Sequence, residues 1–219
     1  DEMGVRAGRS QLLHLLAVDA SGHRHGPRSI VAAPAAAALA DTRVRDVLDA
    51  LREAGIADRT TVIVMSDHGF RPIKTVIRPN AVLLREGLLT ADAEKKAATA
   101  CEAYAITEGG TAFLYATDPA KRETTVARLQ AVFGAVEGIA RILGPEGFVA
   151  AGYPAAGTQE QMPDLVLVAK EGYGFWHDVG REPVGEAREG VTPMGLHGYP
   201  AEDPGMDAVL VAWGRGIRP

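Results

Sequence analysis

Apolar residues form a few short runs near the start of the chain, and two of these runs end at polar residues suited to chemistry. Residues 12–18 are almost continuously apolar, and Asp19 ends the run. This pattern is typical of a strand buried on both faces of a parallel sheet. A second run, β-branched and apolar, covers residues 60–65 and is followed by Asp67 and His68. We therefore predict two strands whose following loops carry polar side chains.

The segment between these runs has the period of a helix. Within residues 34–54, apolar positions from Leu39 to Leu51 recur at helical spacing, and Gly55 supplies a stop. A right-handed crossover through this helix makes the flanking strands parallel. Both polar loops then emerge at the carboxyl edge of one sheet, where open α/β folds bind ligands.

The middle of the chain changes character and is punctuated by Gly and Pro. We predict a helix at 91–104, a strand at 111–115, a helix at 123–133, a strand at 164–168, a loop at 172–195 and a strand at 208–213. The predicted fold class is α/β, a mostly parallel sheet flanked by helices with a small α+β insertion. Its predicted divisions are a metal-binding α/β core (1–90), the insertion (91–190) and a return to the core with the last metal ligand (191–219).

Composition narrows the function classes. The chain has 219 residues, 47% hydrophobic and 23% charged, as expected for a globular protein with a sizeable core. A net charge of −5 offers no basic field for nucleic acid or anionic lipid. The single Cys101 excludes an internal disulfide framework. No run approaches the roughly 20 apolar residues of a membrane span, and residues 1–4 lack a signal-peptide profile. Compartment and oligomeric state stay open.

Carboxylate and imidazole donors occur in three short strings that suggest a dinuclear metal centre. The candidate ligands are Asp19, His23, Asp67, His68 and His197. Oxygen and nitrogen donors without thiolates suit a divalent ion that keeps an open position for substrate, as catalytic zinc does, and manganese accepts the same donors.

Each string is weak alone, and other interpretations stay open. A turn Asp with a surface His would explain the first string, and a polar strand end would explain the second. His25 competes with His23 as a ligand. His177 could line a substrate pocket or serve only in loop packing.

Three strings in order carry a more specific signal: VDASGHRHGP, DRTTVIVMSDHGF, and GLHGYP followed by MDAVLVAWGRGI. Together they resemble the alkaline phosphatase superfamily, and most closely its type I phosphodiesterase/nucleotide pyrophosphatase family. The resemblance covers residues 12–89 and 195–217, while the middle matches loosely. It implies an alkaline phosphatase-like fold with two Zn²⁺ ions.

Residue by residue, the resemblance implies that Asp19, His23 and His197 hold the substrate-facing ion. Asp67 and His68 then hold the other ion. The family's Thr or Ser nucleophile and one further Asp lie upstream of the stretch that matches Asp19, where Ser10 is the sole hydroxyl here. The chain is therefore expected to be the C-terminal portion of a longer protein, incomplete at both ends, with its nucleophile outside this chain.

The implied activity is hydrolysis of phosphoric diesters or nucleotide pyrophosphates, with a small phosphate ester as substrate. Tyr199 is followed by Pro200, where nucleotide pyrophosphatases tend to have Asp. The alternatives are a phosphonate or phosphomonoester hydrolase of the same superfamily, or a non-catalytic metal-binding fragment. We also expect an exposed apolar sheet edge and poor solubility of this segment by itself.

Overall fold

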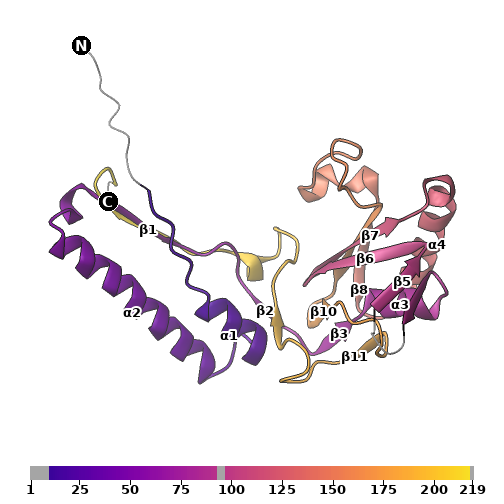
Figure 1. Ribbon diagram of the computed structural model, residues 1–219, viewed down its shortest axis with the longest axis horizontal. Helices are drawn as coiled ribbons and strands as arrows, with labels where there is room; N and C mark the ends of the chain where they lie inside the picture. The colour runs from indigo at the N-terminus through magenta and orange to yellow at the C-terminus, as the bar shows by residue number, and fades with distance from the viewer. Residues whose placement is uncertain (1–9, 93–96, 218–219) are drawn as a thin grey trace, which may run out of the picture.

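The computed structural model describes residues 10–92 and 97–217. One end of the molecule holds helices α1 (Ala17–His25) and α2 (Ala32–Glu53) and the two-stranded ribbon of β1 (Thr61–Met65) and β13 (Leu210–Gly214) (Figure 1). The remaining sheets and helices form the other end. Two short strands, β2 (Arg71–Pro72) and β12 (Gly195–Leu196), connect the ends by pairing with each other.

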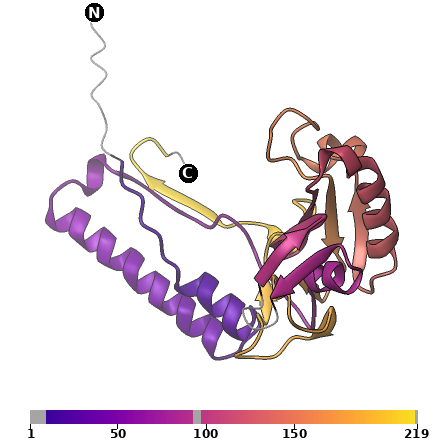
Figure 2. The same ribbon diagram turned by 45° about the vertical axis from the view of Figure 1, so that its right-hand side comes forward.

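Helix α2 confirms the helix predicted between the two apolar runs. Its sequence is rich in Ala, which has the highest helix propensity, and ion pairs such as Arg45 with Asp41 (2.9 Å) support its exposed face. The helix runs alongside the β1–β13 ribbon (Figure 2). Over residues 10–92 and 97–217, no helix is both long and apolar enough to cross a membrane.

The strand predicted at residues 12–18 is wrong. Residues 10–15 adopt no regular structure, and α1 begins at Ala17. Leu12 is 94% exposed, so this run is not buried in a sheet. A strand needs neighbours to pair its backbone groups and to cover its side chains, and the described residues supply no partner strand here. The apolar pattern alone therefore did not produce a strand.

The predicted parallel arrangement of the first strands is also not observed. Strand β1 is confirmed, but it pairs antiparallel with β13, so that Val64 faces Val211. Strand β13 confirms the strand predicted near the end of the chain. Among the strand pairs of the described residues, only β10 with β3 is parallel. The architecture is mixed α/β with small sheets.

The other end is built on an antiparallel sheet of strand order β6-β7-β9-β8. Its strands are β6 (Ala103–Glu108), β7 (Thr111–Ala116), β8 (Ile139–Leu143) and β9 (Leu165–Ala169). All five residues of β9 are buried, and helix α4 (Arg122–Gly134) packs on β7 and β8 and buries Leu129 and Phe133. Strands β7 and β9 and helix α4 confirm three predictions from the pattern.

The helix predicted at residues 91–104 is wrong. The described part of this segment forms β4 (Leu89–Asp92), β5 (Ala97–Cys101) and the start of β6, while residues 93–96 lie outside the described residues. Asn80 contributes to this outcome, because its buried side chain exchanges two 2.9 Å hydrogen bonds with the backbone of Ala105 in β6. Cross-strand pairing outweighs the helix propensity of the alanines.

The predicted loop at 172–195 is partly wrong, because it contains strands. A sheet of order β10-β3-β11 joins β3 (Thr75–Ile77) to β10 (Tyr173–Phe175) and β11 (Val184–Glu186). Helix α3 (Pro79–Arg85) follows β3, and its apolar residues share one core with the large sheet. The divisions at residues 90 and 190 stay a prediction.

Candidate metal centre

The Asp19 carboxylate is the hub of the candidate site. Its Oδ1 atom lies 3.6 Å from His23 Nε2, 4.0 Å from His68 Nε2 and 3.8 Å from His197 Nε2. Ligand atoms of Asp19, His68 and His197 all lie within 4.8 Å of one another. Four of the five predicted ligands, separated by up to 178 positions in sequence (197 minus 19), therefore face one point.

Helix α1 places the first pair of donors. Asp19 and His23 are four residues apart on this helix, so their side chains project from the same face. The sequence pattern placed Asp19 at the end of a strand, and this is wrong because Asp19 lies inside α1. Gly22 lies inside the helix and is buried. The four-residue spacing was a helical signal from the start.

The loop after β1 places the second donor pair. The Ser66 N–H donates to the Val209 carbonyl (2.9 Å), and the Gly69 N–H donates to the Met206 carbonyl (3.0 Å). A Cβ at position 69 would lie 2.2 Å from the Gly205 carbonyl oxygen. Glycine at 69 therefore allows close approach of another backbone segment, which holds His68 toward Asp19.

Strand β12 places the third imidazole. It ends at Leu196, directly before His197, and pairs with β2, which begins at Arg71. The Gly110 N–H donates to the His197 carbonyl oxygen (2.8 Å). The His197 ring stacks on His68 at a centroid distance of 3.7 Å.

Hydrogen bonds define which ring nitrogens face the centre. His23 Nδ1 lies 3.1 Å from the Gly195 carbonyl oxygen, and His68 Nδ1 lies 2.9 Å from the Gly69 carbonyl oxygen. A carbonyl oxygen only accepts, so each Nδ1 carries a proton and donates. In the neutral imidazole, Nε2 is then a lone-pair acceptor directed toward Asp19, as in metal-binding histidines.

The surroundings of His197 favour the neutral form of its ring. Burial of the ring lowers the pKa of His197, and repulsion from His68 and His23 lowers it further. An imidazole must be unprotonated to bind a metal ion. The site therefore presents His197 in a form that can bind a cation at neutral pH.

These donors fit a divalent metal ion. Asp19 Oδ1 is buried and has no hydrogen-bond partner. A buried acceptor without a donor is costly, and here it faces further acceptors. A cation at this point would satisfy all of them. Carboxylate and imidazole donors without thiolates match the ligand chemistry of a catalytic zinc site.

The remaining candidates from the sequence lie differently. The Asp67 side chain is 83% exposed, and its Oδ1 lies 3.7 Å from His68 Nε2 at the margin of the cluster. The competing His25 turns away and pairs with Glu189 (2.7 Å). His177 is exposed and packs on Trp176. How the ligands divide between one ion and two stays a prediction.

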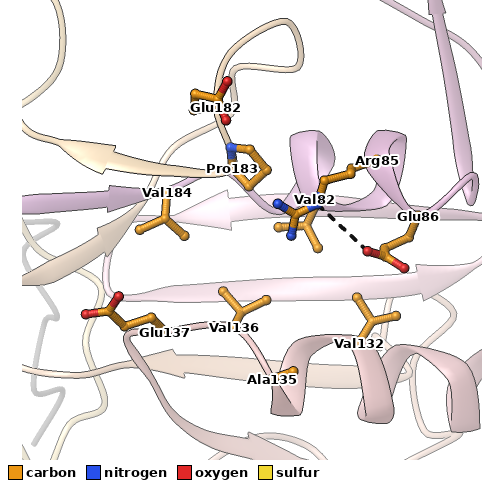
Figure 3. Close-up of a pocket in the computed structure, with 10 residues that line it drawn as sticks. All are labelled: Val82, Arg85, Glu86, Val132, Ala135, Val136, Glu137, Glu182, Pro183 and Val184. Atoms are coloured by element: carbon orange, nitrogen blue, oxygen red, sulfur yellow. Dashed lines mark ion pairs between the residues drawn. The ribbon is translucent and has the colours of Figure 1, made fainter.

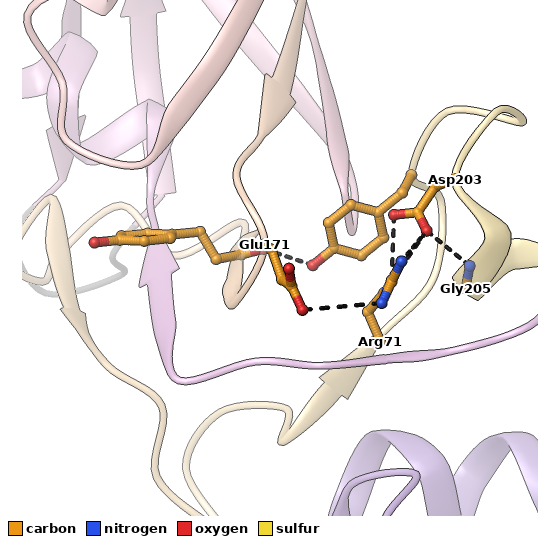
Figure 4. Close-up of polar contacts among 6 residues, drawn as sticks. Arg71, Glu171, Asp203 and Gly205 are labelled. Carbon is orange, nitrogen blue, oxygen red and sulfur yellow. Dashed lines mark hydrogen bonds and ion pairs between the residues drawn. The ribbon is translucent and has the colours of Figure 1, made fainter.

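An Arg–Asp pair beside the cluster was missed by the sequence reasoning. Arg71 Nε donates to both carboxylate oxygens of Asp203 (3.0 and 3.2 Å), and its Nη2 donates to the same group (Figure 4). This hydrogen bonding lowers the pKa of the Asp203 carboxyl. The pair ties β2, which follows His68, to the loop that follows His197. No local pattern indicates this pair, because the two residues are 132 positions apart in sequence.

A cavity of about 360 Å³ lies elsewhere, between α3, the end of α4 and β11 (Figure 3). Four valines, including Val82, Val132 and Val184, line it together with four charged residues, including Arg85 and Glu182. None of the candidate metal ligands lines it, so this cavity is separate from the cluster.

The fold and the cluster define a mixed α/β protein with a candidate metal centre of one carboxylate and three imidazoles. The chain belongs to the type I phosphodiesterase/nucleotide pyrophosphatase family, whose model matches residues 9–200.

Comparison with solved structures supports the same fold. Human ectonucleotide pyrophosphatase/phosphodiesterase 5 superposes with a TM-score of 0.66 at 18% identity, covering 91% of this chain and 46% of that chain. The murine protein, also solved as an inactive variant in complex with AMP, gives a TM-score of 0.63 at 20% identity, covering 90% and 44%. The chain therefore spans under half the length of these neighbours. Comparison with the curated proteins finds no match.

Proposed function

We propose that this chain contributes metal ligands to a hydrolase of phosphoric diesters or nucleotide pyrophosphates. The observation that carries the proposal is the buried, unpartnered Asp19 Oδ1 atom faced by three imidazole nitrogens. Family membership supports the reaction class, and the AMP complex of the murine neighbour supports a nucleotide as the substrate type.

In this proposal, Asp19, His23 and His197 hold one Zn²⁺, and Asp67 and His68 hold a second. When bound, such a pair supplies activation of a hydroxyl nucleophile and neutralises charge on the phosphoryl oxygens and the leaving group. The Nδ1 hydrogen bonds of His23 and His68 fix these rings with Nε2 toward the centre. As the family resemblance implies, the proposed nucleophile is a Thr or Ser that lies outside this chain.

Metal content and hydrolysis test the proposal together. The 219-residue chain is prepared with zinc, and bound metal is measured by mass spectrometry. The protein that carries the chain is assayed on bis-p-nitrophenyl phosphate with and without a chelator, followed by a nucleotide diester. His23→Gln and His25→Gln form a matched pair, because His25 is two residues away but points at Glu189.

We expect bound zinc and chelator-sensitive diesterase activity, both reduced by His23→Gln and both retained by His25→Gln. Bound zinc without diesterase activity would favour the phosphonate or phosphomonoester alternative, or a non-catalytic fragment. Absence of bound zinc after zinc-supplemented preparation would refute the metal centre.

A further inference from the structure

The Phe70 ring lies against three of the candidate ligands at once. Its centroid is 4.9 Å from that of His23, 5.8 Å from that of His68 and 5.4 Å from that of His197. The interplanar angles are 75°, 61° and 80°, so all three contacts are close to edge-to-face. This geometry is a favourable one for aromatic pairs, and it restricts how each imidazole can rotate.

The backbone on both sides of Phe70 is held in place. Gly69 donates its N–H to the Met206 carbonyl oxygen, and Arg71 pairs with Leu196 across the β2–β12 ladder. The Arg71 side chain is bound by Asp203. The phenyl ring is therefore attached to a fixed segment. By packing against the imidazole rings, it can restrict the side-chain torsion angles of the three histidines.

His197 depends on the Phe70 ring more than the other two imidazoles do. His23 and His68 are each oriented by a hydrogen bond from Nδ1 to a carbonyl oxygen. Within residues 10–92 and 97–217, no hydrogen bond orients the His197 ring, which is held by stacking on His68, by a tilted contact with the His23 ring (5.0 Å) and by the T-shaped contact with Phe70. Removing the phenyl ring would free His197 first.

Helix α1 also packs closely against the Phe70 ring, through Gly22. A Cβ built on Gly22 would lie 3.0 to 3.1 Å from Cζ, Cε1 and Cε2 of Phe70. Glycine inside a helix is ordinarily destabilising relative to alanine, so its position here has a packing reason. The absence of a side chain at 22 therefore leaves room for the Phe70 ring beside α1.

We propose that Phe70 is a positioning residue of the metal centre, which sets the imidazole planes of His23, His68 and His197 so that their Nε2 atoms converge on Asp19. Gly22 provides the space for the phenyl ring. This inference rests on the proposed metal-binding function, but it concerns a residue that supplies no ligand atom.

The test uses the 219-residue chain in four forms: parent, Phe70→Leu, Gly22→Ala and Phe113→Leu. Phe113→Leu is a matched control, because Phe113 is also half-buried and makes a T-shaped ring contact, with Tyr153. Zinc affinity is measured by competition with a chromophoric chelator, and the visible spectrum of the cobalt-loaded protein reports the ligand geometry. Thermal unfolding of the metal-free forms shows whether each variant is folded.

We expect Phe70→Leu to weaken zinc binding about 10- to 100-fold, the range typical of partners that orient metal ligands, and to change the cobalt spectrum. Gly22→Ala raises the helix propensity of α1 and removes no packed side chain, so this variant is expected to fold even if Phe70→Leu does not. It should weaken binding several-fold in the parent and have less effect when Phe70 is already Leu, because the two groups are in contact. Phe113→Leu should leave affinity and spectrum unchanged.

Two results would overturn the inference, and they are distinguishable. Folded Phe70→Leu and Gly22→Ala proteins with the parent's zinc affinity and cobalt spectrum would show that Phe70 does not position the ligands. A folded parent that binds neither metal would instead remove the proposed metal centre on which the inference rests.

Discussion

Replacing Asp19 by Asn should separate metal binding from folding. The two side chains have the same shape, but Asn has lost the negative charge and gained an N–H donor. Asp19 Oδ1 is a buried acceptor that faces the Nε2 atoms of His23, His68 and His197 at 3.6 to 4.0 Å. An amide N–H at this position would give one of these nitrogens a donor.

The expected difference in stability between Asp19→Asn and the parent has opposite signs with and without metal. Without metal, Asp19→Asn should be as stable as the parent or more stable by up to about 1 kcal/mol, the net value of one hydrogen bond. With zinc at a hundredfold excess over its Kd, the parent gains about 2.7 kcal/mol. For a domain of this size, that corresponds to a rise in Tm of about 5–11 °C. The variant should gain less than about 2 °C.

Thermal unfolding by circular dichroism, with chelator and with zinc, measures both effects in one protein. Asp41→Asn is the control, because Asp41 is an exposed helix carboxylate that pairs with Arg45 and is not one of the candidate ligands, so this variant should keep the full zinc response. An Asp19→Asn protein that keeps the parent's zinc-induced rise in Tm would refute the reasoning. So would a large loss of stability without metal, because it would mean that the charge serves folding.

Three further predictions concern the surroundings of the site. Hydrogen bonding to Arg71 lowers the pKa of the Asp203 carboxyl in the folded state. The ionised Asp203 therefore stabilises the fold fully above its unfolded pKa of about 4, and this stabilisation is lost as pH falls through the folded pKa. Chemical denaturation of Asp203→Asn should show about 1–2 kcal/mol of destabilisation at pH 7 that shrinks below pH 4, whereas a pH-independent difference would contradict the linkage. Gly69→Ala places a Cβ 2.2 Å from a backbone carbonyl oxygen, so it should lower Tm and zinc affinity together, and unchanged values of both would show that the loops can separate. Ile63 and Leu210 are 56% and 70% exposed on one face of the β1–β13 ribbon, so the chain alone should bind a hydrophobic dye such as ANS, and replacing both by Thr should reduce that binding.

The local sequence pattern predicted an element correctly where that element's own periodicity and residue propensities determine its structure. Helix α2 has an Ala-rich amphipathic sequence, and β1, β7 and β9 are β-branched or apolar runs bounded by turn residues. Each was predicted within a few residues. These elements reach their structure largely through periodicity and propensity, so the sequence alone determines where they fall.

The errors occur where a partner decides the structure. Residues 12–18 read as a buried strand, but no described strand pairs with them, and Leu12 and Leu16 are exposed. Residues 91–104 were predicted as a helix, yet in their described part β5 pairs with β4 and the start of β6 pairs with β7. Pairing partners far away in sequence are invisible to a local pattern.

The difference between local sequence properties and contacts made by distant segments also explains which parts of the candidate site could be predicted. The ligand types at Asp19, His23, His68 and His197 were visible in three sequence motifs, because donor chemistry is a property of single residues. The contacts that hold them were not visible, because Gly22 against Phe70 and Arg71 against Asp203 join segments that no motif connects. A purely structural cluster would be expected to satisfy its own buried atoms. Here the fold brings three separate segments together around an oxygen that none of them satisfies. An acceptor that is left without a donor among oriented imidazoles supports the cation binding that we propose for this site.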